Sequence, residues 1–381
     1  MPKTSLYHKL VNASALMFGK LPGEERILWA LSQTIPEEDL RIYFLIPFGS
    51  TIPLEKLARK AARLGYDRLR LEETLERLYQ QAFVMRHHTP QGVAYESCPL
   101  SMTAEQQVRM RKGSELGKAY ADYWLSLAEV AAYQLPTRTP YFRILPVERT
   151  IQPAEKVRIE INHPIPDPRQ VLPLDVVSQM VRQQKLIGVA ECYCRLSRQM
   201  QGAPCSKPHE TCFVFNQFAQ SLIDLGIARP LSLEEALEIL EACEKEGLVH
   251  NIDNFQGEIR GLCNCCACCC PGMKATAAGK KNIEAVSRYR VVFEAHKCAA
   301  DHACVEMCPV RAVRVGEDGL PQVDHALCLG CGLCVSVCPQ GALHLELRQK
   351  APAVPPSAKA LQNSLMREAL VGFVWKKISG R

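Results

Sequence analysis

The sequence predicts an α+β protein made of separate modules, and three observations carry this prediction. Apolar residues recur at helical spacing in the first 135 residues, the stretch that follows is rich in proline, and most of the 19 cysteines come after residue 190. A chain of 381 residues is long enough for two or three domains, each with its own core. The expected parts are a helical domain at 1–135, a proline-rich connection at 136–170, a cysteine-rich domain at 171–295, a second cysteine module at 296–348 and a tail at 349–381.

The first domain shows the order of elements that is typical of a winged-helix unit. Helices are predicted at 24–32, 54–64 and 71–81, then a hairpin at 83–95 around the turn TPQG, then a longer helical region at 102–134. Such units bind DNA in regulators, but the helix that would enter the groove, LEETLERLYQQ, is acidic. Because phosphate contacts dominate DNA affinity, we expect packing or protein contacts here in place of nucleic-acid binding.

Two distant segments resemble one another. LRLEETLERL at 69–78 and LSLEEALEIL at 231–240 agree at seven of ten positions, and each precedes a predicted strand, at 83–88 and at 248–253. The pattern predicts a helix-and-strand unit that occurs twice, the second copy being a scaffold for the cysteines that follow. A generic amphipathic pattern is the alternative. Cys243 lies on the apolar side of the second helix and is expected in the core, and Cys98 has no partner nearby in the sequence.

Proline marks two breaks in the chain. The first, at 136–170, is interrupted by the alternating segment KVRIEI at 156–161, which predicts an edge strand. The second, APAVPPSA at 351–358, precedes a basic tail helix. The apolar stripe of that helix comprises Leu361, Leu365, Ala369, Leu370 and Phe373, with Trp375 near its basic end. This helix is expected to lie on an anionic membrane surface, to dock in a partner's groove or to fold back on its own domain.

The strongest signal is a cysteine motif near the C-terminus. The run CLGCGLCVSVCP has the spacing C-x2-C-x2-C-x3-C-P and contains Cys328, Cys331, Cys334 and Cys338. Thirty residues upstream, KCAADHACVEMCP places Cys298, Cys304 and Cys308 at the first, third and fourth positions of the same motif, with Asp301 at the second. Such thiolate spacings are typical of iron-sulfur clusters.

Residues 296–346 resemble the bacterial dicluster ferredoxin domain, which carries two 4Fe-4S clusters. The resemblance implies that one cluster, called cluster A here, is held by Cys308, Cys328, Cys331 and Cys334. It assigns the second, cluster B, to Cys298, Cys304, Cys338 and Asp301. A zinc ribbon is the alternative, since paired C-x-x-C also suits tetrahedral zinc.

Asp301 departs from the family pattern. A carboxylate is a harder and weaker ligand for cluster iron than a thiolate. Three outcomes follow: a 4Fe-4S cluster with Asp301 bound, a 3Fe-4S cluster with that corner empty, or a 4Fe-4S cluster whose labile iron takes an external ligand. The neighbouring His302 is a second candidate for the same corner, and a corner without functional importance is the remaining interpretation.

Ten further cysteines lie between residues 192 and 270. One group contains Cys192, Cys194, Cys205 and Cys212, and the other, CNCCACCCPG, contains Cys263, Cys265, Cys266, Cys268, Cys269 and Cys270. Thiols at this density predict metal ligation, with one or two more 4Fe-4S clusters, or zinc as the alternative. Residues 171–275 resemble a family of little-characterised iron-sulfur proteins of anaerobic prokaryotes, and this resemblance implies oxygen-sensitive electron transfer.

These patterns predict an electron carrier that relays electrons between partner redox proteins, or a subunit of a redox complex. No G-x-G-x-x-G or P-loop motif occurs, so electrons are expected to pass through protein partners or a ligand on a cluster. The alternatives are a redox-sensing transcription regulator and an iron-sulfur enzyme with an open iron site. No apolar run approaches the length of a membrane helix and no signal peptide is recognised, so we expect a cytoplasmic protein.

Overall fold

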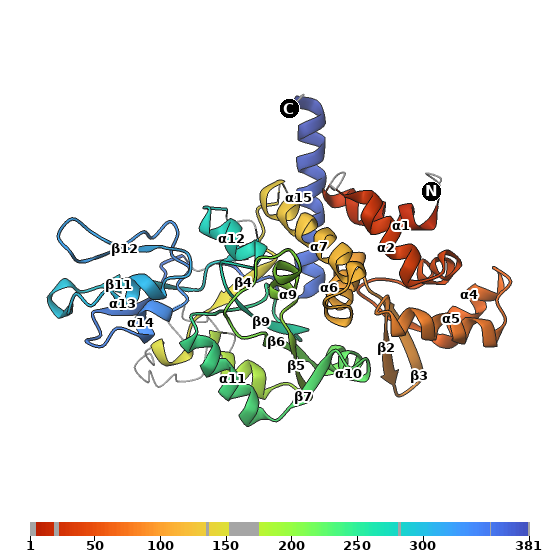
Figure 1. Cartoon of the computed structure of the whole chain (residues 1–381), viewed down its shortest axis with the longest axis horizontal. Helices are drawn as coiled ribbons and strands as arrows, with labels where there is room; N and C mark the ends of the chain where they lie inside the picture. The colour runs from red at the N-terminus through yellow and green to blue at the C-terminus, as the bar shows by residue number, and fades with distance from the viewer. Residues whose placement is uncertain are drawn as a thin grey trace, which may run out of the picture. The chain divides into compact units, whose positions relative to one another are not determined.

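The computed structural model describes residues 5–18, 23–134, 137–151, 175–280, 283–350 and 352–379 (Figure 1). The chain divides into two compact units. The first comprises Met1–Leu135, Ala190–His209 and Gln217–Arg229, and the second comprises Pro136–Val189, Glu210–Asn216 and Pro230–Arg381. The region expected as a cysteine-rich domain, 171–295, therefore contributes to both units. The strand expected at 156–161 lies outside the described residues.

The structure contains both helices and sheets, as an α+β protein should. The elements of the first unit are α1 (Leu6–Phe18), α2 (Glu24–Thr34), α3 (Leu40–Tyr43), β1 (Ile52–Pro53), α4 (Leu54–Ala62), α5 (Arg68–Gln80), β2 (Val84–Thr89), β3 (Gly92–Ser97), α6 (Leu100–Met110), α7 (Glu115–Gln134) and α9 (Tyr193–Met200), with most of α10 (Asn216–Asp224). Their core includes Ile27, Leu57, Leu75, Tyr120 and Leu196.

Helices α2, α4 and α5 and the hairpin β2–β3 lie where the sequence predicts helices and a hairpin. The short strand β1 pairs with β3, which gives a three-stranded sheet in the order β1–β3–β2. Helix α5 begins three residues earlier than expected, because the side chain of Asp67 accepts a hydrogen bond from the Arg70 amide at 2.8 Å and caps the helix. The earlier start adds Arg68 and Arg70, so this helix is less acidic than the segment 71–81 alone.

The single helical region expected at 102–134 is two helices, α6 and α7. Gly113, with φ +80°, lies in the turn between them. This left-handed conformation costs glycine little and ends the first helix. The Ser114 hydroxyl then accepts a hydrogen bond from the Gly117 amide at 3.0 Å at the start of the second helix. A helix stop and a helix start within five residues thus replace a continuous helix.

The second unit is built around a mixed sheet. Its elements are β4 (Phe142–Leu145), α8 (Val177–Arg182), β6 (Glu210–Phe215), α11 (Leu233–Lys245), β8 (Val249–Asp253), β9 (Gly261–Cys265), α12 (Pro271–Ala277), β10 (Glu284–Ala285), β11 (Tyr289–Phe293), α13 (Ala303–Met307), β12 (Val313–Val315), β13 (Pro321–Val323), α14 (Leu333–Ser336), β14 (Leu343–Leu347) and α15 (Ala358–Ser379). The sheet order is β10–β4–β8–β9–β6–β5–β7, in which β5 (Ile187–Glu191) and β7 (Ala228–Leu231) have residues in both units.

The two similar segments of the sequence both form a helix followed by a strand. Helix α11 precedes β8 just as α5 precedes β2, and Ser232 begins α11 with a capping box that includes Glu235. The surroundings differ, however. The hairpin β8–β9 lies inside the large sheet between β4 and β6, whereas β2–β3 has only the short β1 beside it. The second hairpin therefore holds the cysteines of β9 within a sheet.

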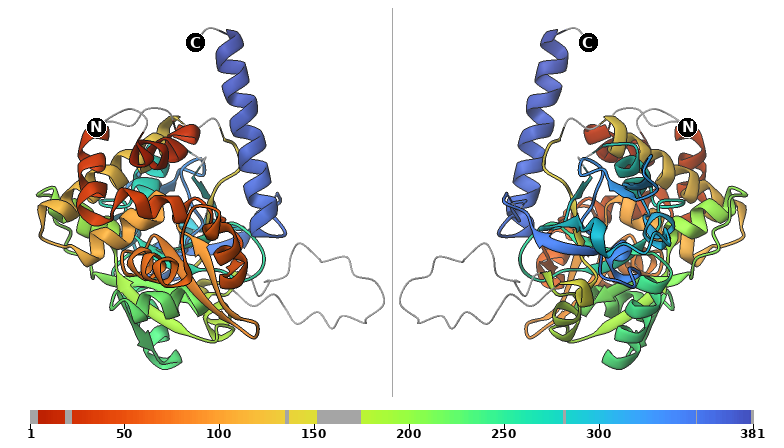
Figure 2. Two further views of the ribbon diagram at one scale, coloured as in Figure 1. Left: turned by 90° about the vertical axis from the view of Figure 1, so that its right-hand side faces the viewer. Right: turned by 90° about the vertical axis from the view of Figure 1, so that its left-hand side faces the viewer.

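Helix α15 is one long helix of the second unit (Figure 2). The side chains of Leu361, Leu365 and Ala369 are buried, whereas Leu370 is 63% exposed. The Glu368 carboxylate accepts hydrogen bonds from the backbone amides of Arg138 at 2.7 Å and Thr139 at 2.9 Å. The first half of the helix thus folds back on its own unit. None of the helices in the described part of the chain has the length and apolarity that crossing a membrane requires.

Candidate iron-sulfur centre

The two cysteine loops of residues 298–308 and 328–338 have matching backbone conformations. Left-handed φ angles occur at Ala300 (55°) and His302 (59°) in the first loop and at Gly330 (67°) and Gly332 (77°) in the second. Each loop contains a short helix, α13 in the first and α14 in the second, and the two helices contact each other (Figure 1). The repeated motif of the sequence is therefore also a repeated backbone path, even where residues other than glycine occupy the strained positions.

Three buried thiols of this module, those of Cys328, Cys331 and Cys334, interact with the half-buried Cys308. Burial, with smaller contributions from the thiols of Cys308 and Cys328, raises the pKa of Cys331 to about 12. Burial also raises the pKa of Cys334, with contributions from Cys331, Cys308 and Cys328. The thiol of Cys308 thus has an electrostatic effect on two cysteines of the other loop.

A second group surrounds Cys304. Burial raises the pKa of this thiol first, and Cys338, Asp301 and Cys298 add smaller contributions. Cys338 belongs to the second loop by sequence and lies with the residues of the first. Electrostatic effects thus run between the loops in both directions, since Cys304 also raises the pKa of Cys334. Metal binding requires thiolates, so ligands with raised pKa values release protons when they bind.

Asp301 occupies the exposed corner of the second group. Its Oδ1 accepts a hydrogen bond from the Ala303 amide at 3.1 Å, and Nε2 of His302 lies 2.9 Å from the Gly319 carbonyl oxygen. The carboxylate of Asp301 thus caps the start of α13, while the His302 ring is held by the loop before β13. Of these two candidates, Asp301 is the one with an electrostatic effect on Cys304.

The loop that carries Cys328 and Cys331 is held by residues far away in the sequence. The Cys328 carbonyl accepts a hydrogen bond from the Arg348 guanidinium at 3.0 Å, and the Cys331 carbonyl accepts one from the Val147 amide at 2.9 Å. Between them, the Ser287 hydroxyl donates to the Gly330 carbonyl at 2.6 Å. These three hydrogen bonds connect the loop to other parts of the second unit. Sequence reasoning missed them, because none of the three donors belongs to a motif.

Backbone amides also reach the sulfur atoms. The Ala312 amide lies 3.1 Å from Sγ of Cys308, and the Ala300 amide lies 3.4 Å from Sγ of Cys298. Hydrogen bonds to cluster-ligating sulfur stabilise the reduced, more negative state and raise the reduction potential. Two cysteine sulfurs of the first loop therefore each have a backbone amide directed at them.

The six-cysteine run forms two sets of three thiols. Cys263 and Cys265 lie in β9 and Cys270 precedes α12; hydrogen bonds to Cys263 and Cys270, followed by burial, raise the pKa of Cys265. In the turn between these elements, the sulfur atoms of Cys266, Cys268 and Cys269 all lie within 4.8 Å of one another. We call these sets the strand triplet and the turn triplet. The sulfur atoms of the turn triplet are close enough to bind one metal ion together, whereas the thiols of the strand triplet are linked through their interactions with Cys265.

Buried polar side chains hold β9 in place beside the strand triplet. The His250 ring in β8 has its Nδ1 2.6 Å from Oδ1 of Asn264 and its Nε2 3.2 Å from a carboxylate oxygen of Glu244. Glu244 also forms an ion pair with Arg149, and Asn264 donates to the Thr211 carbonyl at 2.8 Å. This network links α11, β8, β9 and β6, so the strand that carries Cys263 and Cys265 has a fixed position.

The other group of cysteines is divided between the units. Cys192, Cys194 and Cys205 belong to the first unit and Cys212 to the second, where it lies in β6. Cys192 directly precedes α9 and Cys194 lies within it, both buried, while Cys205 accepts a hydrogen bond from the Lys207 amide at 3.4 Å. The buried guanidinium of Arg195 donates to the Pro208 carbonyl at 2.9 Å and so ties α9 to the loop that follows Cys205.

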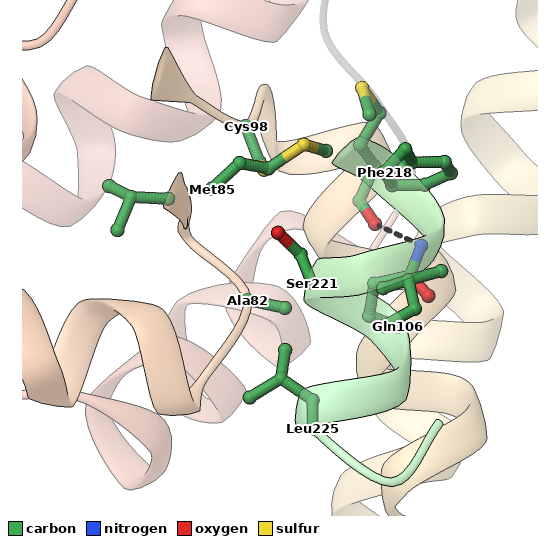
Figure 3. Close-up of a pocket in the computed structure, with 10 residues that line it drawn as sticks. Ala82, Met85, Cys98, Gln106, Phe218, Ser221 and Leu225 are labelled. Atoms are coloured by element: carbon green, nitrogen blue, oxygen red, sulfur yellow. Dashed lines mark hydrogen bonds between the residues drawn. The ribbon is translucent and has the colours of Figure 1, made fainter. Parts of the chain in front are cut away.

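The two scattered cysteines lie in apolar surroundings. Cys243 is buried in α11. Cys98 lines a small cavity of the first unit, together with Met85 and Phe218 (Figure 3). The cavity measures about 10 Å³, which is room for a water molecule at most. A cluster does not fit there.

Comparisons with known proteins agree with the chemistry of the C-terminal module. A family model described as a 4Fe-4S binding domain matches residues 321–344. The chain is 35% identical over 85 residues to a subunit of the tetrathionate reductase of Archaeoglobus fulgidus, a match that covers 19% of this chain and 41% of that protein. It is 44% identical over 46 residues to Ferredoxin 7Fe of Hydrogenibacillus schlegelii, covering 12% of this chain and 58% of that protein.

A third relative is a subunit of the Na⁺-translocating ferredoxin:NAD⁺ oxidoreductase complex of Acetobacterium woodii, 44% identical over 48 residues, or 13% of this chain and 14% of that protein. The chain spans less than two thirds of the length of each of these relatives. No solved structure matches the chain. The matches support an iron-sulfur domain with a role in electron transfer, and its relatives are ferredoxins and subunits of redox complexes.

Proposed function

We propose that this protein is a multi-cluster electron carrier that relays electrons between partner redox proteins in the cytoplasm, as part of anaerobic metabolism. The proposal is supported most directly by electrostatic effects between the two cysteine loops: Cys308 raises the pKa of Cys331 and Cys334, and Cys338 raises that of Cys304. Two clusters that share one folded module in this way are held at a short, fixed separation. When bound, 4Fe-4S clusters supply one-electron transfer, and the protein supplies spacing, potential and docking surface.

The thiols fit this cofactor better than they fit a structural zinc ion. Cys308, Cys328, Cys331 and Cys334 hold cluster A in this proposal, and Cys298, Cys304 and Cys338 hold cluster B with Asp301 at its fourth corner. A buried, thiol-rich group with backbone amides directed at sulfur suits a cluster whose charge changes by one electron. The exposed Asp301 loop is the side from which a redox partner approaches, since the thiols of Cys331 and Cys334 are buried.

Asp301 is proposed as a labile iron ligand. Its exposed carboxylate is a weaker ligand than a thiolate, so this corner alternates between a 4Fe-4S and a 3Fe-4S form. A relative named Ferredoxin 7Fe matches this module. Seven iron atoms are the content of one 4Fe-4S and one 3Fe-4S cluster. An enzyme with an external ligand at the same iron is the second candidate, and the exposure of this corner is the observation that favours it.

The turn triplet is proposed to hold a third cluster. Cys266, Cys268 and Cys269 supply three thiolates, and the fourth ligand comes from outside this turn. The strand triplet, Cys263, Cys265 and Cys270, is the candidate for a fourth centre. The remaining proposed ligands of this middle region are Cys192, Cys194, Cys205 and Cys212. Single cysteine-to-serine variants would identify which of them is the fourth ligand of each centre.

The N-terminal elements are proposed as a winged-helix-like scaffold that does not read DNA. All three arginines of α5 form ion pairs within the first unit: Arg68 with Glu55 at 2.7 Å, Arg70 with Glu38 at 3.1 Å and Arg77 with Asp39 at 2.9 Å. Cations that neutralise neighbouring carboxylates are poorly suited to phosphate binding. A redox-regulated DNA-binding protein would instead show salt-dependent binding to duplex DNA.

The test is iron analysis of matched serine variants purified without oxygen. Cys331→Ser should lower the iron content by about four atoms and abolish one EPR signal of the reduced protein, because it removes a ligand of cluster A. Cys268→Ser should lower it by a similar amount through the turn triplet. Cys243→Ser is the control, since this thiol is buried in α11 and is not one of the proposed ligands. Equal iron content in all three variants would refute the assignment, and zinc in place of iron would refute the carrier.

A further inference from the structure

The second unit contains a pocket that the electron-carrier proposal does not use. Its volume is about 350 Å³, within the range of small-molecule sites. One wall is apolar and includes Pro140, Val286 and Leu329, and another is polar and includes Asn254. Two cationic side chains, Arg138 and Lys280, line it as well. The pocket thus combines an apolar surface with positive charge and hydrogen-bonding groups.

Asn254 supplies the sharpest evidence that a ligand binds here. The residue is 2% exposed, and its Oδ1 has no hydrogen-bond partner among the described residues. The orientation of its amide is determined, because Nδ2 donates to the Pro140 carbonyl at 2.9 Å and an oxygen in that place would face another acceptor. A buried carbonyl oxygen without a donor is costly, so this atom calls for an N–H or O–H group from a ligand.

The other polar groups of the pocket restrict the ligand further. Glu284 is buried, and its two carboxyl oxygens already accept hydrogen bonds from Asn251 at 2.8 Å and Thr276 at 3.1 Å. The carboxyl oxygens of Glu284 are therefore less available to a ligand than Oδ1 of Asn254. The exposed guanidinium of Arg138 provides charge at the edge of the pocket, where it would face an anionic substituent.

The pocket also borders the proposed cluster A. Leu327 and Leu329, which flank Cys328 in the sequence, both line it. A molecule in the pocket would therefore lie beside the loop that carries this thiol. The binding site itself requires only the residues of the pocket and does not depend on whether clusters are present.

We infer that this pocket binds a small organic anion with an apolar body, whose N–H or O–H group donates to Asn254 and whose charge faces Arg138 and Lys280. Flavin mononucleotide is a suitable probe, since it combines an apolar ring, an imide N–H and a phosphate. Riboflavin has the same ring without the charge, and inorganic phosphate has the charge without the ring.

The experiment is anaerobic titration calorimetry on the full-length protein. Flavin mononucleotide should bind with saturation, riboflavin about tenfold more weakly, and inorganic phosphate not measurably. Arg138→Gln should weaken the binding of flavin mononucleotide and leave riboflavin unchanged. Asn254→Leu should weaken both flavins by about tenfold, the value of one hydrogen bond. Lys185→Gln is the matched control, because this exposed cation does not line the pocket.

Three results would overturn the inference. The first is no binding of flavin mononucleotide at millimolar concentration. The second is equal affinity for the two flavins, which would remove the role of charge. The third is an equal loss of affinity in Arg138→Gln and Lys185→Gln, which would show only general attraction to a cationic surface. Iron content, measured on the same samples, reports separately on the electron-carrier proposal. The surface substitution at Arg138 keeps the test valid even if Asn254→Leu fails to fold.

Discussion

At the scale of single residues, Asp301 determines how the module differs from a ferredoxin with eight cysteine ligands. A thiolate at this corner would bind iron more tightly than the carboxylate. We expect Asp301→Cys to convert any 3Fe-4S EPR signal of the oxidised protein into the signature of a stable 4Fe-4S cluster. Asp301→Ala is the comparison and should increase the 3Fe-4S signal. Identical spectra for the two variants would show that the side chain at 301 does not reach iron.

Gly330 is the residue at which the loop of cluster A tolerates least change. Its φ is +67°, and a Cβ there would overlap the Tyr289 carbonyl oxygen and the Ser287 hydroxyl. We expect Gly330→Ala to displace the loop and to lower the iron content. Gly341 has a similar φ of +63° with open space around it. Gly341→Ala should therefore lower the free energy of unfolding only by the backbone strain, about 1 kcal/mol, and leave the iron content unchanged. Equal iron loss in both variants would make strain, and not the close contact, the cause.

Glu368 gives the tail contact a defined pH dependence. Burial opposes ionisation of this carboxyl, but hydrogen bonds from Thr139 and Arg138 outweigh it and lower its pKa below the ordinary value of 4.5. The contact therefore stabilises the folded state above that value and is lost as the pH falls through the lower, folded-state pKa. Above pH 4.5 the Thr139 amide should exchange more slowly in the wild-type protein than in Glu368→Gln. This difference should shrink as the pH falls through the lowered pKa of Glu368. A constant ratio of the two rates across this range would contradict the assignment.

At the scale of elements, α15 has two halves with different expected roles. The first half buries Leu361 and Leu365, each worth about 2 kcal/mol. Deleting residues 351–381 should thus lower the unfolding temperature. Deleting only 371–381 should leave stability and iron content unchanged and remove Lys376 and Lys377, weakening binding to anionic vesicles at low salt. If the shorter deletion leaves vesicle binding intact, the basic end does not act as a membrane contact.

The hairpins show how one local pattern serves two surroundings. Both α5 and α11 lead into a strand, but only β8–β9 is enclosed between neighbouring strands. Enclosure in the sheet and the His250 network position Cys263 and Cys265, which an edge hairpin would leave mobile. The shared segment therefore explains the helix and the strand, and the sheet order explains why the second copy encloses Cys263 and Cys265.

At the scale of the whole molecule, total iron measures how many centres the chain holds. Two clusters in the C-terminal module account for about seven or eight iron atoms, and a third in the turn triplet brings the total to about 11 or 12. Protein purified without oxygen should contain at least this amount, with matching sulfide. A value near eight, together with zinc, would show that the middle cysteines bind a structural metal.

The sequence alone determined the chemistry of the ligands and much of the local structure. The C-x2-C-x2-C-x3-C-P spacing identified the iron-sulfur domain, because ligand spacing within a short loop is a local property. Helices α2, α4 and α5 followed from apolar periodicity, with errors at ends where one side chain, such as that of Asp67, decides the start. The division of the six-cysteine run into two triplets had no signal in the sequence, since adjacent thiols look equivalent there.

Only the tertiary structure decided which distant groups meet. Val147, Ser287 and Arg348 support the loop of Cys328, and no periodicity or motif singles them out. The pocket around Asn254 likewise combines residues from five separate stretches of the chain. Ligand identity depends on residue type and local spacing, which the sequence contains directly. The support of a loop and the walls of a pocket depend on chain packing over more than a hundred residues, which appears only once the sheet and its loops are assembled.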